Sequence, residues 1–202
     1  MTTLINPYYD ELKRNVKRSR HYHTGTEEFV TYSRFGENFR EFRRSYVIKY
    51  AWAIPTEEAI RAIAKFSNNK IVEIGAGTGY WAWLLQQVGV TVHAYDKYLE
   101  NNPYKHEHTY TELKKGGHNT LRKYNHEWTL FLCWPPFDDP MASRCLRRFT
   151  GRKFIYIGES EYGCTGDNRF HEALDKWWNR IDEINIPQWN GIHDYVQMYE
   201  RK

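Results

Sequence analysis

The chain has 202 residues, of which 41% are hydrophobic and 17% aromatic, so it can form one domain with a sizeable core and is not intrinsically disordered. Its net charge of +4 and pI of about 8.8 permit a polyanionic partner but exclude the extreme basicity of a dedicated nucleic-acid coat protein. The N-terminus is rich in charge and no apolar run approaches the ~20 residues that cross a bilayer, so we expect a soluble cytoplasmic protein without membrane contact.

Residues 1–50 differ from the rest of the chain, because they are basic and aromatic with few aliphatic side chains. We predict an N-terminal extension (1–50) with one or two helices, packed across a main domain (51–202). The aromatic residues are Tyr8, Tyr9, Tyr22, Phe29, Tyr32, Phe35, Phe39, Phe42, Tyr46 and Tyr50. Such a mixture suits single-stranded nucleic acid, with Arg14, Arg18, Arg40 and Arg43 on phosphates and rings stacked on bases. Alternatively, the rings pack on the sheet and the charges form a solvated helix face.

Regular elements begin after Pro55. Thr56 has the side chain of a helix N-cap, and the apolar positions of 57–66 fall on one helical face. The elements predicted up to residue 113 are a helix over 57–66, a strand over 70–74, a helix over 80–88 ended by Gly89, a strand over 90–95 and a weak strand near 108–113.

The second half continues the alternation of strands and helices until its end. It predicts strands over 127–133 and 153–157, helices over 140–149 and 167–178, and two closing strands over 180–186 and 194–199. Alternation implies a mostly parallel sheet covered by helices on both faces. We therefore predict an α/β three-layer sandwich with a seven-stranded sheet, an antiparallel closing strand and a helical N-terminal extension.

The sequence from Ile71 to Gly79, Ile-Val-Glu-Ile-Gly-Ala-Gly-Thr-Gly, is a buried strand followed by a glycine turn. Glycine allows the backbone to approach a ligand closely. Asp96 ends the next strand about 20 residues later, where an α/β nucleotide site places the carboxylate that accepts from ribose hydroxyls. A dinucleotide fingerprint would require a small residue where Tyr80 stands, and no Gly-Lys-Ser/Thr of a P-loop follows.

The pattern Glu-x-Gly-x-Gly-x-Gly over 73–79 resembles motif I of class I S-adenosylmethionine (SAM) methyltransferases. The resemblance covers about residues 55–202 and implies SAM as cofactor. It implies that the glycines wrap the methionine part of SAM, that Glu73 helps to position its amino group, and that Asp96 accepts from the ribose hydroxyls. The cofactor-binding residues expected on this basis are Glu73, Gly75, Ala76, Gly77, Gly79, Asp96 and Cys133. For the adenine, residues 110–112 are the candidate region.

Cys133-Trp134-Pro135-Pro136-Phe137 lies where methyltransferases of exocyclic amino groups carry Asn/Asp/Ser-Pro-Pro-Tyr/Phe. The resemblance implies that the backbone carbonyls of Trp134 and Pro135 accept from the amino group, that Phe137 stacks on the base, and that the two prolines keep the loop extended. Trp134 departs from the pattern, because its indole only donates a hydrogen bond. It can instead stack on a planar substrate or form a pocket wall.

Glu159, just past a predicted strand, is the candidate general base, with a loop salt bridge as the alternative role. Cys133, Cys145 and Cys164 have no metal-ligand spacing, which predicts reduced thiols in an intracellular protein. No metal is expected.

The sequence therefore predicts a SAM-dependent methyltransferase with Trp134, Pro135, Phe137 and Glu159 at the reacting end. RNA or another nucleic acid, reached through the N-terminal extension, is the favoured acceptor. A small molecule or a protein side chain is the alternative. A non-catalytic SAM-binding scaffold subunit and a nicotinamide oxidoreductase, which Tyr80 disfavours, are competing hypotheses.

Overall fold

A computed structural model describes residues 3–20, 27–30, 39–100, 102–106, 108–160 and 163–202. The predicted aromatic positions Tyr22, Tyr32 and Phe35 lie outside these residues. None of the helices described is both long and apolar enough to cross a membrane.

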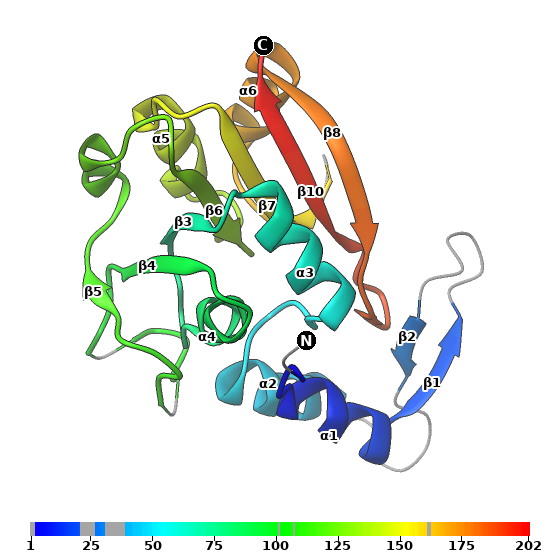
Figure 1. The fold of residues 1–202 in the computed structure, drawn as a ribbon. Helices are drawn as coiled ribbons and strands as arrows, with labels where there is room; N and C mark the ends of the chain where they lie inside the picture. Colours follow the sequence, from blue (N-terminus) through cyan, green and yellow to red (C-terminus); the bar gives the residue numbers. More distant parts are fainter. Residues whose placement is uncertain (1–2, 21–26, 31–38, 101, 107, 161–162) are drawn as a thin grey trace.

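The centre of the fold is a seven-stranded sheet in the order β5-β4-β3-β6-β7-β10-β8 (Figure 1). Neighbouring strands from β5 to β7 run parallel, whereas β10 is antiparallel to both β7 and β8. The strands are β3 (Lys70–Ile74), β4 (Thr91–Asp96), β5 (Lys114–Lys115), β6 (Thr129–Cys133), β7 (Lys153–Glu159), β8 (Trp178–Asn185) and β10 (Asp194–Arg201). The predicted α/β class, with its mostly parallel sheet and antiparallel closing strand, is confirmed.

Helices cover both faces of this sheet, and each face has its own apolar cluster. The helices α3 (Glu57–Phe66) and α4 (Tyr80–Gln87) pack against one face, and Figure 1 shows α3 in front of the strands and α4 below β4. The helices α5 (Met141–Arg148) and α6 (Asn168–Trp177) and the 3-10 helix η2 (His118–Lys123) pack against the opposite face. Successive residues of β3 point to opposite faces, so Ile71 joins the α3–α4 cluster and Val72 the α5–α6 cluster. The two apolar clusters hold a layer of helices on each face of the sheet, which gives the three layers of the fold.

The predicted helices agree with the structure to within one or two residues at each end. At the start of α3, Thr56 accepts a hydrogen bond from the backbone N–H of Ala59 at 3.1 Å, as an N-cap should. The predicted strand near 108–113 is wrong, because the third parallel strand is β5, and Leu113 instead packs into the apolar cluster beside α4.

The N-terminal part, predicted to contain one or two helices, contains α1 (Pro7–Asn15) and α2 (Phe39–Lys49). It also contains an antiparallel pair that the sequence did not indicate, β1 (Lys17–Arg20) and β2 (Glu27–Val30). A short strand near the C-terminus, β9 (Gln188–Trp189), pairs with β2 in parallel. Backbone pairing thus joins the N-terminal part to a segment about 160 residues further along the chain.

The aromatic side chains described in α1 and α2 pack inward. Tyr8, Tyr46 and Tyr50 are buried, and the rings of Tyr8 and Tyr50 stack with centroids 4.8 Å apart. Trp189 donates from Nε1 to the Tyr8 hydroxyl at 3.1 Å. These rings are not free to stack on bases. The division into domains at residue 50 stays a prediction.

Replacement of Leu12 by Ala tests whether α1 belongs to one cooperative core. Leu12 is fully buried in the α3–α4 cluster. Removing its side chain should lower the free energy of unfolding by about 2–5 kcal/mol in urea titrations. Ile5→Ala, at a position that is 63% exposed, is the matched control and should change it by less than about 0.5 kcal/mol. Equal stability of the two variants would contradict a shared core.

Candidate functional site

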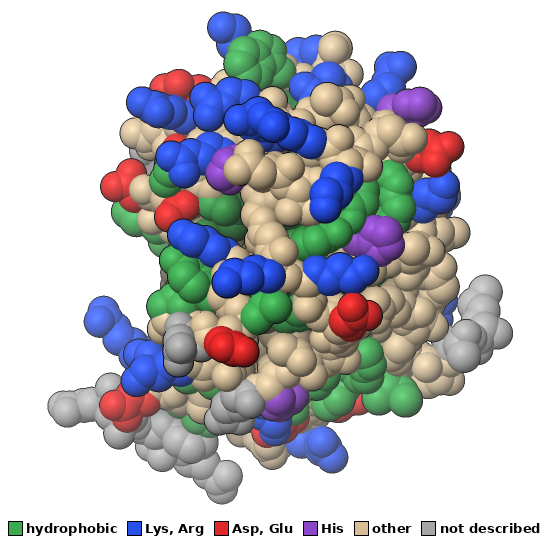
Figure 2. Space-filling model, turned by 90° about the vertical axis from the view of Figure 1, so that its left-hand side faces the viewer, with side chains coloured by type: hydrophobic (Ala, Val, Ile, Leu, Met, Phe, Trp, Pro, Cys, Tyr) green, Lys and Arg blue, Asp and Glu red, His purple; other side chains and the backbone are tan. Residues whose placement is uncertain are grey.

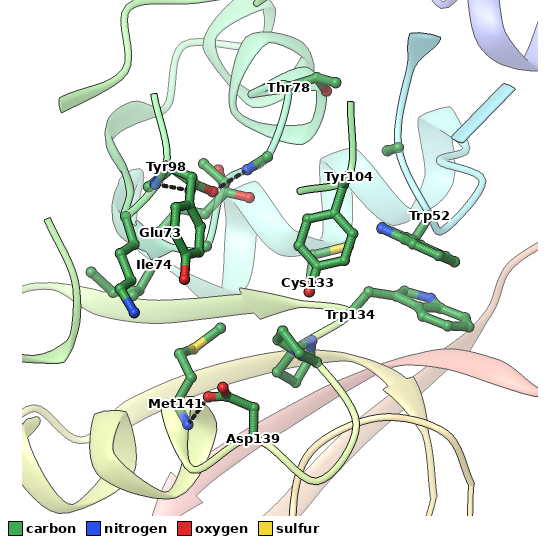
Figure 3. Close-up of a pocket in the computed structure, with 18 of the residues that line it drawn as sticks. Trp52, Glu73, Ile74, Thr78, Tyr98, Tyr104, Cys133, Trp134, Asp139 and Met141 are labelled. Carbon is green, nitrogen blue, oxygen red and sulfur yellow. Dashed lines mark hydrogen bonds between the residues drawn. The ribbon is translucent and has the colours of Figure 1, made fainter. Parts of the chain in front are cut away.

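A cavity of about 760 Å³ lies at the carboxyl ends of β3, β4 and β6 (Figure 3). In the view of Figure 3, Glu73 and Tyr98 lie at one end, Trp52 and Trp134 at the other, and Tyr104 and Cys133 between them. Open α/β sheets bind ligands at this edge. Of the residues predicted to form the site, the cavity is lined by Glu73, Gly75, Ala76, Gly77, Asp96, Cys133, Trp134, Pro135 and Phe137.

The glycine turn between β3 and α4 has a backbone that only glycine adopts easily. Gly75, Gly77 and Gly79 have φ angles of 78°, 59° and 71°. A Cβ on Gly75 would lie 2.9 Å from Cε of Met141, and one on Gly77 would lie 3.0 Å from Cε1 of His106. Glycine therefore keeps both the turn conformation and the space above it. Gly79 does not line the cavity; it forms the N-cap of α4.

Asp96 fixes this turn to the end of β4. Its Oδ2 accepts from the backbone N–H of Gly77 at 2.9 Å, and its Oδ1 accepts from that of Tyr98 at 2.8 Å. Each carboxylate oxygen has a further lone pair for a ligand hydroxyl. Asp96 therefore organises the turn and faces the cavity at the same time.

Glu73 is a buried carboxyl group that lacks a full set of partners. It is 1% exposed, and its Oε2 has no hydrogen-bond partner among the described residues. Burial, and then the nearby Asp96 carboxylate, raise the pKa of Glu73 well above its ordinary value. An unsatisfied buried carboxyl is costly. A cationic donor bound in the cavity would satisfy it.

The cysteines at the site are not poised as nucleophiles. Burial raises the pKa of Cys133 well above its ordinary value, and the nearby carboxyls of Glu73 and Asp194 raise it further. Burial, followed by a hydrogen bond to Glu159, raises the pKa of Cys164 to about 12. Both therefore stay thiols at neutral pH, whereas the thiolate is the reactive form. Within the described part of the chain, no three His, Cys, Asp or Glu side chains could hold a metal ion.

Trp134 begins the loop after β6 in an unusual conformation. The prediction that this loop is extended is wrong at Trp134, which has a φ of 52°. This conformation is unfavourable for a bulky side chain. Two hydrogen bonds hold it: its backbone N–H donates to the carbonyl of Ile157 at 2.7 Å, and its Nε1 donates to Oδ2 of Asp194 at 2.8 Å. The indole thus points inward and forms a cavity wall, which is one of its two predicted roles.

The remainder of this loop is partly committed to structure. We expected the carbonyl of Pro135 to be free to accept a hydrogen bond from the substrate's amino group. It instead accepts one from the backbone N–H of Gly166 at 3.0 Å. Oδ1 of Asp139 accepts from the backbone N–H of Met141, the first residue of α5, at 2.8 Å. Phe137 is 67% exposed and lies where the cavity opens, so it remains available for stacking.

Glu159 has both carboxylate oxygens occupied by backbone hydrogen bonds, so it is not available as a general base. It is absent from the lining of the large cavity and borders a smaller, neighbouring one. Its two oxygens accept from the backbone N–H groups of Cys164 and His193 at 2.8 and 2.9 Å. Burial raises its pKa, but these hydrogen bonds outweigh it and lower the pKa below the ordinary value. This carboxylate therefore links the loop that contains Cys164 to the loop that contains His193. Its lowered pKa makes it a weak proton acceptor.

Arg43, which we predicted to contact a phosphate, places its guanidinium at the Trp52–Trp134 end of the cavity. Its charge acts on the buried Asp194, a residue that the sequence did not single out. The guanidinium of Arg43 lies 5.4 Å from the ring of Trp52 and 5.3 Å from that of Trp134, and these two rings stack 5.2 Å apart. Nε and Nη2 of Arg43 and Oδ1 of Asp194 are buried without hydrogen-bond partners among the described residues. Burial, opposed by Trp134 and Arg43, raises the pKa of Asp194 to about 7. Only the position of Asp194 at a strand start marks it in the sequence.

The far side of the cavity is formed by the start of η2. Gly116, Gly117, His118 and Asn119 line it, together with Tyr98. The region 110–112, predicted to contact an adenine, lies elsewhere: Tyr110 packs against Tyr80 with ring centroids 4.7 Å apart.

No protein-family model matches the sequence, and neither does any curated protein sequence. The fold resembles solved structures. Magnesium protoporphyrin IX methyltransferase from Synechocystis PCC 6803 with bound S-adenosylhomocysteine (SAH) matches with a TM-score of 0.50 and 11% identity, over 86% of this chain and 90% of that one. A SAM-dependent methyltransferase from Anabaena variabilis has a TM-score of 0.47 and 11% identity, over 81% and 93%. At such identity the likeness establishes the fold, that of class I methyltransferases.

Proposed function

We propose that the protein is a SAM-dependent methyltransferase. The observation that carries the proposal is the buried, partly unsatisfied Glu73 carboxyl beside the left-handed turn of Gly75 and Gly77. SAM presents an ammonium group, a ribose diol and a flat purine. The solved structures of this fold include methyltransferases with bound SAM or SAH.

The residues present fit SAM. Glu73 would hold the ammonium, Asp96 the ribose hydroxyls, and the start of η2 with Tyr98 would border the purine. A volume of about 760 Å³ lies in the range of cofactor pockets. When bound, SAM would supply a methyl group: the acceptor's nucleophile would bond to the methyl carbon as its bond to the positively charged sulfur breaks, and SAH would leave as the neutral thioether. The protein then has to align the acceptor, exclude water and accept a proton.

The acceptor would bind at the end formed by Trp52, Trp134 and Arg43. Trp134 cannot accept a hydrogen bond, but its indole holds Asp194. Oδ1 of Asp194 remains unpaired, and a pKa of about 7 suits a general base. We therefore assign the role first given to Glu159 to Asp194. Asp194, like Glu159, is absent from the lining of the large cavity, and it bonds to Trp134, which does line it. It would therefore receive the proton through a bridging water, and its unpaired Oδ1 is what distinguishes it from Glu159.

A nucleobase of RNA is the acceptor that we propose. Its support is the indole wall, the exposed ring of Phe137, and a donor, Arg43, near an unpaired acceptor, Asp194. A base edge offers complementary donors and acceptors, and aromatic side chains stack on its faces. A small planar molecule fits the same wall and is the second candidate.

The experiment is transfer of labelled methyl from SAM to a cell extract, divided by sensitivity to RNase, DNase and protease. We expect label that RNase removes. Label confined to protein or small molecules would overturn the RNA acceptor and leave the methyltransferase. A folded protein that binds neither SAM nor SAH in calorimetry would overturn both.

Glu73→Gln tests the ammonium contact. The amide keeps the shape of the carboxyl but lacks its charge, so we expect SAM to bind at least tenfold more weakly, as for the loss of a hydrogen bond to a charged group. Glu57→Gln, an exposed acid at the start of α3, is the control and should bind SAM as the wild type does. Unchanged affinity in Glu73→Gln would remove Glu73 from the cofactor site.

A further inference from the structure

Basic side chains gather on the face of the molecule formed by β5, η2 and α5. Figure 2 shows this side, where Lys and Arg side chains occupy the middle of the upper half and acidic side chains lie toward its edges. The basic face, as we call it, consists of Lys114, Lys115, Arg122, Lys123, Arg144, Arg147 and Arg148. Among the described residues, none of these seven forms an ion pair with a carboxylate.

The positive charges of this face converge. Arg144, Arg147 and Arg148 follow the three- and four-residue spacing that places side chains on one side of a helix, and η2, which carries Arg122, packs against α5. His118 lies at the start of η2, and burial lowers its pKa. The positive charges of Arg122 and of the three arginines of α5 lower this pKa further. Unpaired charges so close together create a strong positive potential.

The basic face continues into the cavity. Arg144 and His118 belong to the lining of the cavity, while Arg147 and Arg148 lie on the next turn of α5, outside that lining. Lys97, exposed just after β4, also borders the cavity. A polyanion bound along the face would therefore reach the cavity mouth, where Phe137 is exposed.

The chemistry of the face favours a nucleic acid over a membrane. No large apolar side chain of β5, η2 or α5 is exposed, whereas membrane-surface helices combine basic residues with exposed apolar ones. Aromatic rings lie at the cavity, in Trp52, Tyr104 and Phe137. A positively charged track beside aromatic rings is the arrangement that binds single strands. A base enters a pocket at least cost when it is not already paired in a duplex.

We propose that the basic face binds the phosphate backbone of single-stranded nucleic acid and directs one nucleotide into the cavity. The second half of this statement rests on the proposed function, and the first does not. The proposal moves the nucleic-acid surface away from the N-terminal extension, whose described aromatic side chains are largely buried.

The test uses the full chain and a fluorescent 12-nucleotide RNA of mixed sequence, with binding measured by anisotropy between 50 and 200 mM salt. The variant Arg122→Gln/Arg147→Gln/Arg148→Gln omits Arg144 because Arg144 lines the cavity. Each phosphate contact contributes about 0.7 to the slope of log K against log salt for single strands. That slope is negative, so the loss of three contacts should make it less steep by about 2. Binding should weaken at least tenfold at 50 mM salt.

The control is Arg14→Gln/Arg40→Gln/Arg44→Gln, which removes the same charge from α1 and α2. It should bind RNA as the wild type does, and both variants should bind SAM normally in calorimetry. An unchanged salt slope in the first variant, or an equal loss in both, would overturn the proposal. So would binding to vesicles of anionic lipid without binding to RNA, or a preference for duplex. RNA binding lost in the first variant alone, in a protein that does not bind SAM, would retain the basic face and reject the methyltransferase.

Discussion

Asp96→Ala should weaken SAM binding by about 10- to 100-fold, which corresponds to about 1–3 kcal/mol for a hydrogen-bonding site left without its partner. The loss has two sources. In the proposed site the ribose hydroxyls would lose their acceptor, and the backbone N–H groups of Gly77 and Tyr98 would lose the carboxylate that fixes them. Titration calorimetry with SAM and SAH measures the effect.

Glu100→Ala is the matched control, since it removes an equal charge four residues further along, from an exposed position. It separates hydrogen bonding from net charge and should leave the affinity unchanged. The fold of Asp96→Ala is checked by circular dichroism. A folded Asp96→Ala protein with wild-type affinity for SAM would exclude Asp96 from the cofactor site.

The parts of this fold that the sequence predicted depend on local chemistry. The N-cap at Thr56 needs only one side chain and the N–H three residues ahead. The glycine turn needs three residues with positive φ. The central strands are continuous apolar runs because both of their faces are covered. Such signals lie within a few residues, and the elements they predict are confirmed.

The parts that were missed depend on contacts between distant residues. Phe29 of β2 pairs with Trp189 of β9, and no local pattern specifies which segments meet across that separation. Strand β5 consists of two lysines, Lys114 and Lys115. Lysine has a low preference for β-strands, so these residues do not indicate a strand. The polar sequence on either side of β5 contains no pattern that indicates where this strand lies.

The candidate site divides in the same way. Residues 73–78 and Asp96 lie next to one another at the cavity, because the carboxyl ends of neighbouring parallel strands meet at one edge. The choice between Glu159 and Asp194, by contrast, depends on which oxygens are already bonded. Both acids belong to the antiparallel pair β7–β10, in which Asp194 lies directly opposite Glu159. Hydrogen-bond partners distinguish them, and those are visible only in three dimensions.

Asp194→Asn should make the protein more stable above pH 7 and nearly abolish methyl transfer. Burial raises the pKa of Asp194 from its ordinary 3.8 to about 7, so between these values the folded protein binds a proton that the unfolded chain has lost. The free energy of unfolding therefore falls as pH rises through this range, by at most about 4 kcal/mol. Asparagine cannot ionise and keeps an oxygen for the Trp134 indole. The stability advantage of the variant should appear between pH 4 and 7 and stay constant above.

Urea unfolding at pH 4, 6 and 8 measures the first half of this prediction, and methyl transfer at saturating SAM the second. If Asp194 accepts the proton, kcat should fall by about 10²–10⁴, and the wild-type rate should rise with pH through the pKa of that carboxyl. Normal SAM affinity in the variant would place the loss at the acceptor end. Active Asp194→Asn with an unaltered pH profile would limit Asp194 to holding Trp134. A protein that retains an ionisable group against its own stability does so where function requires it, and the two measurements together test whether Asp194 is such a group.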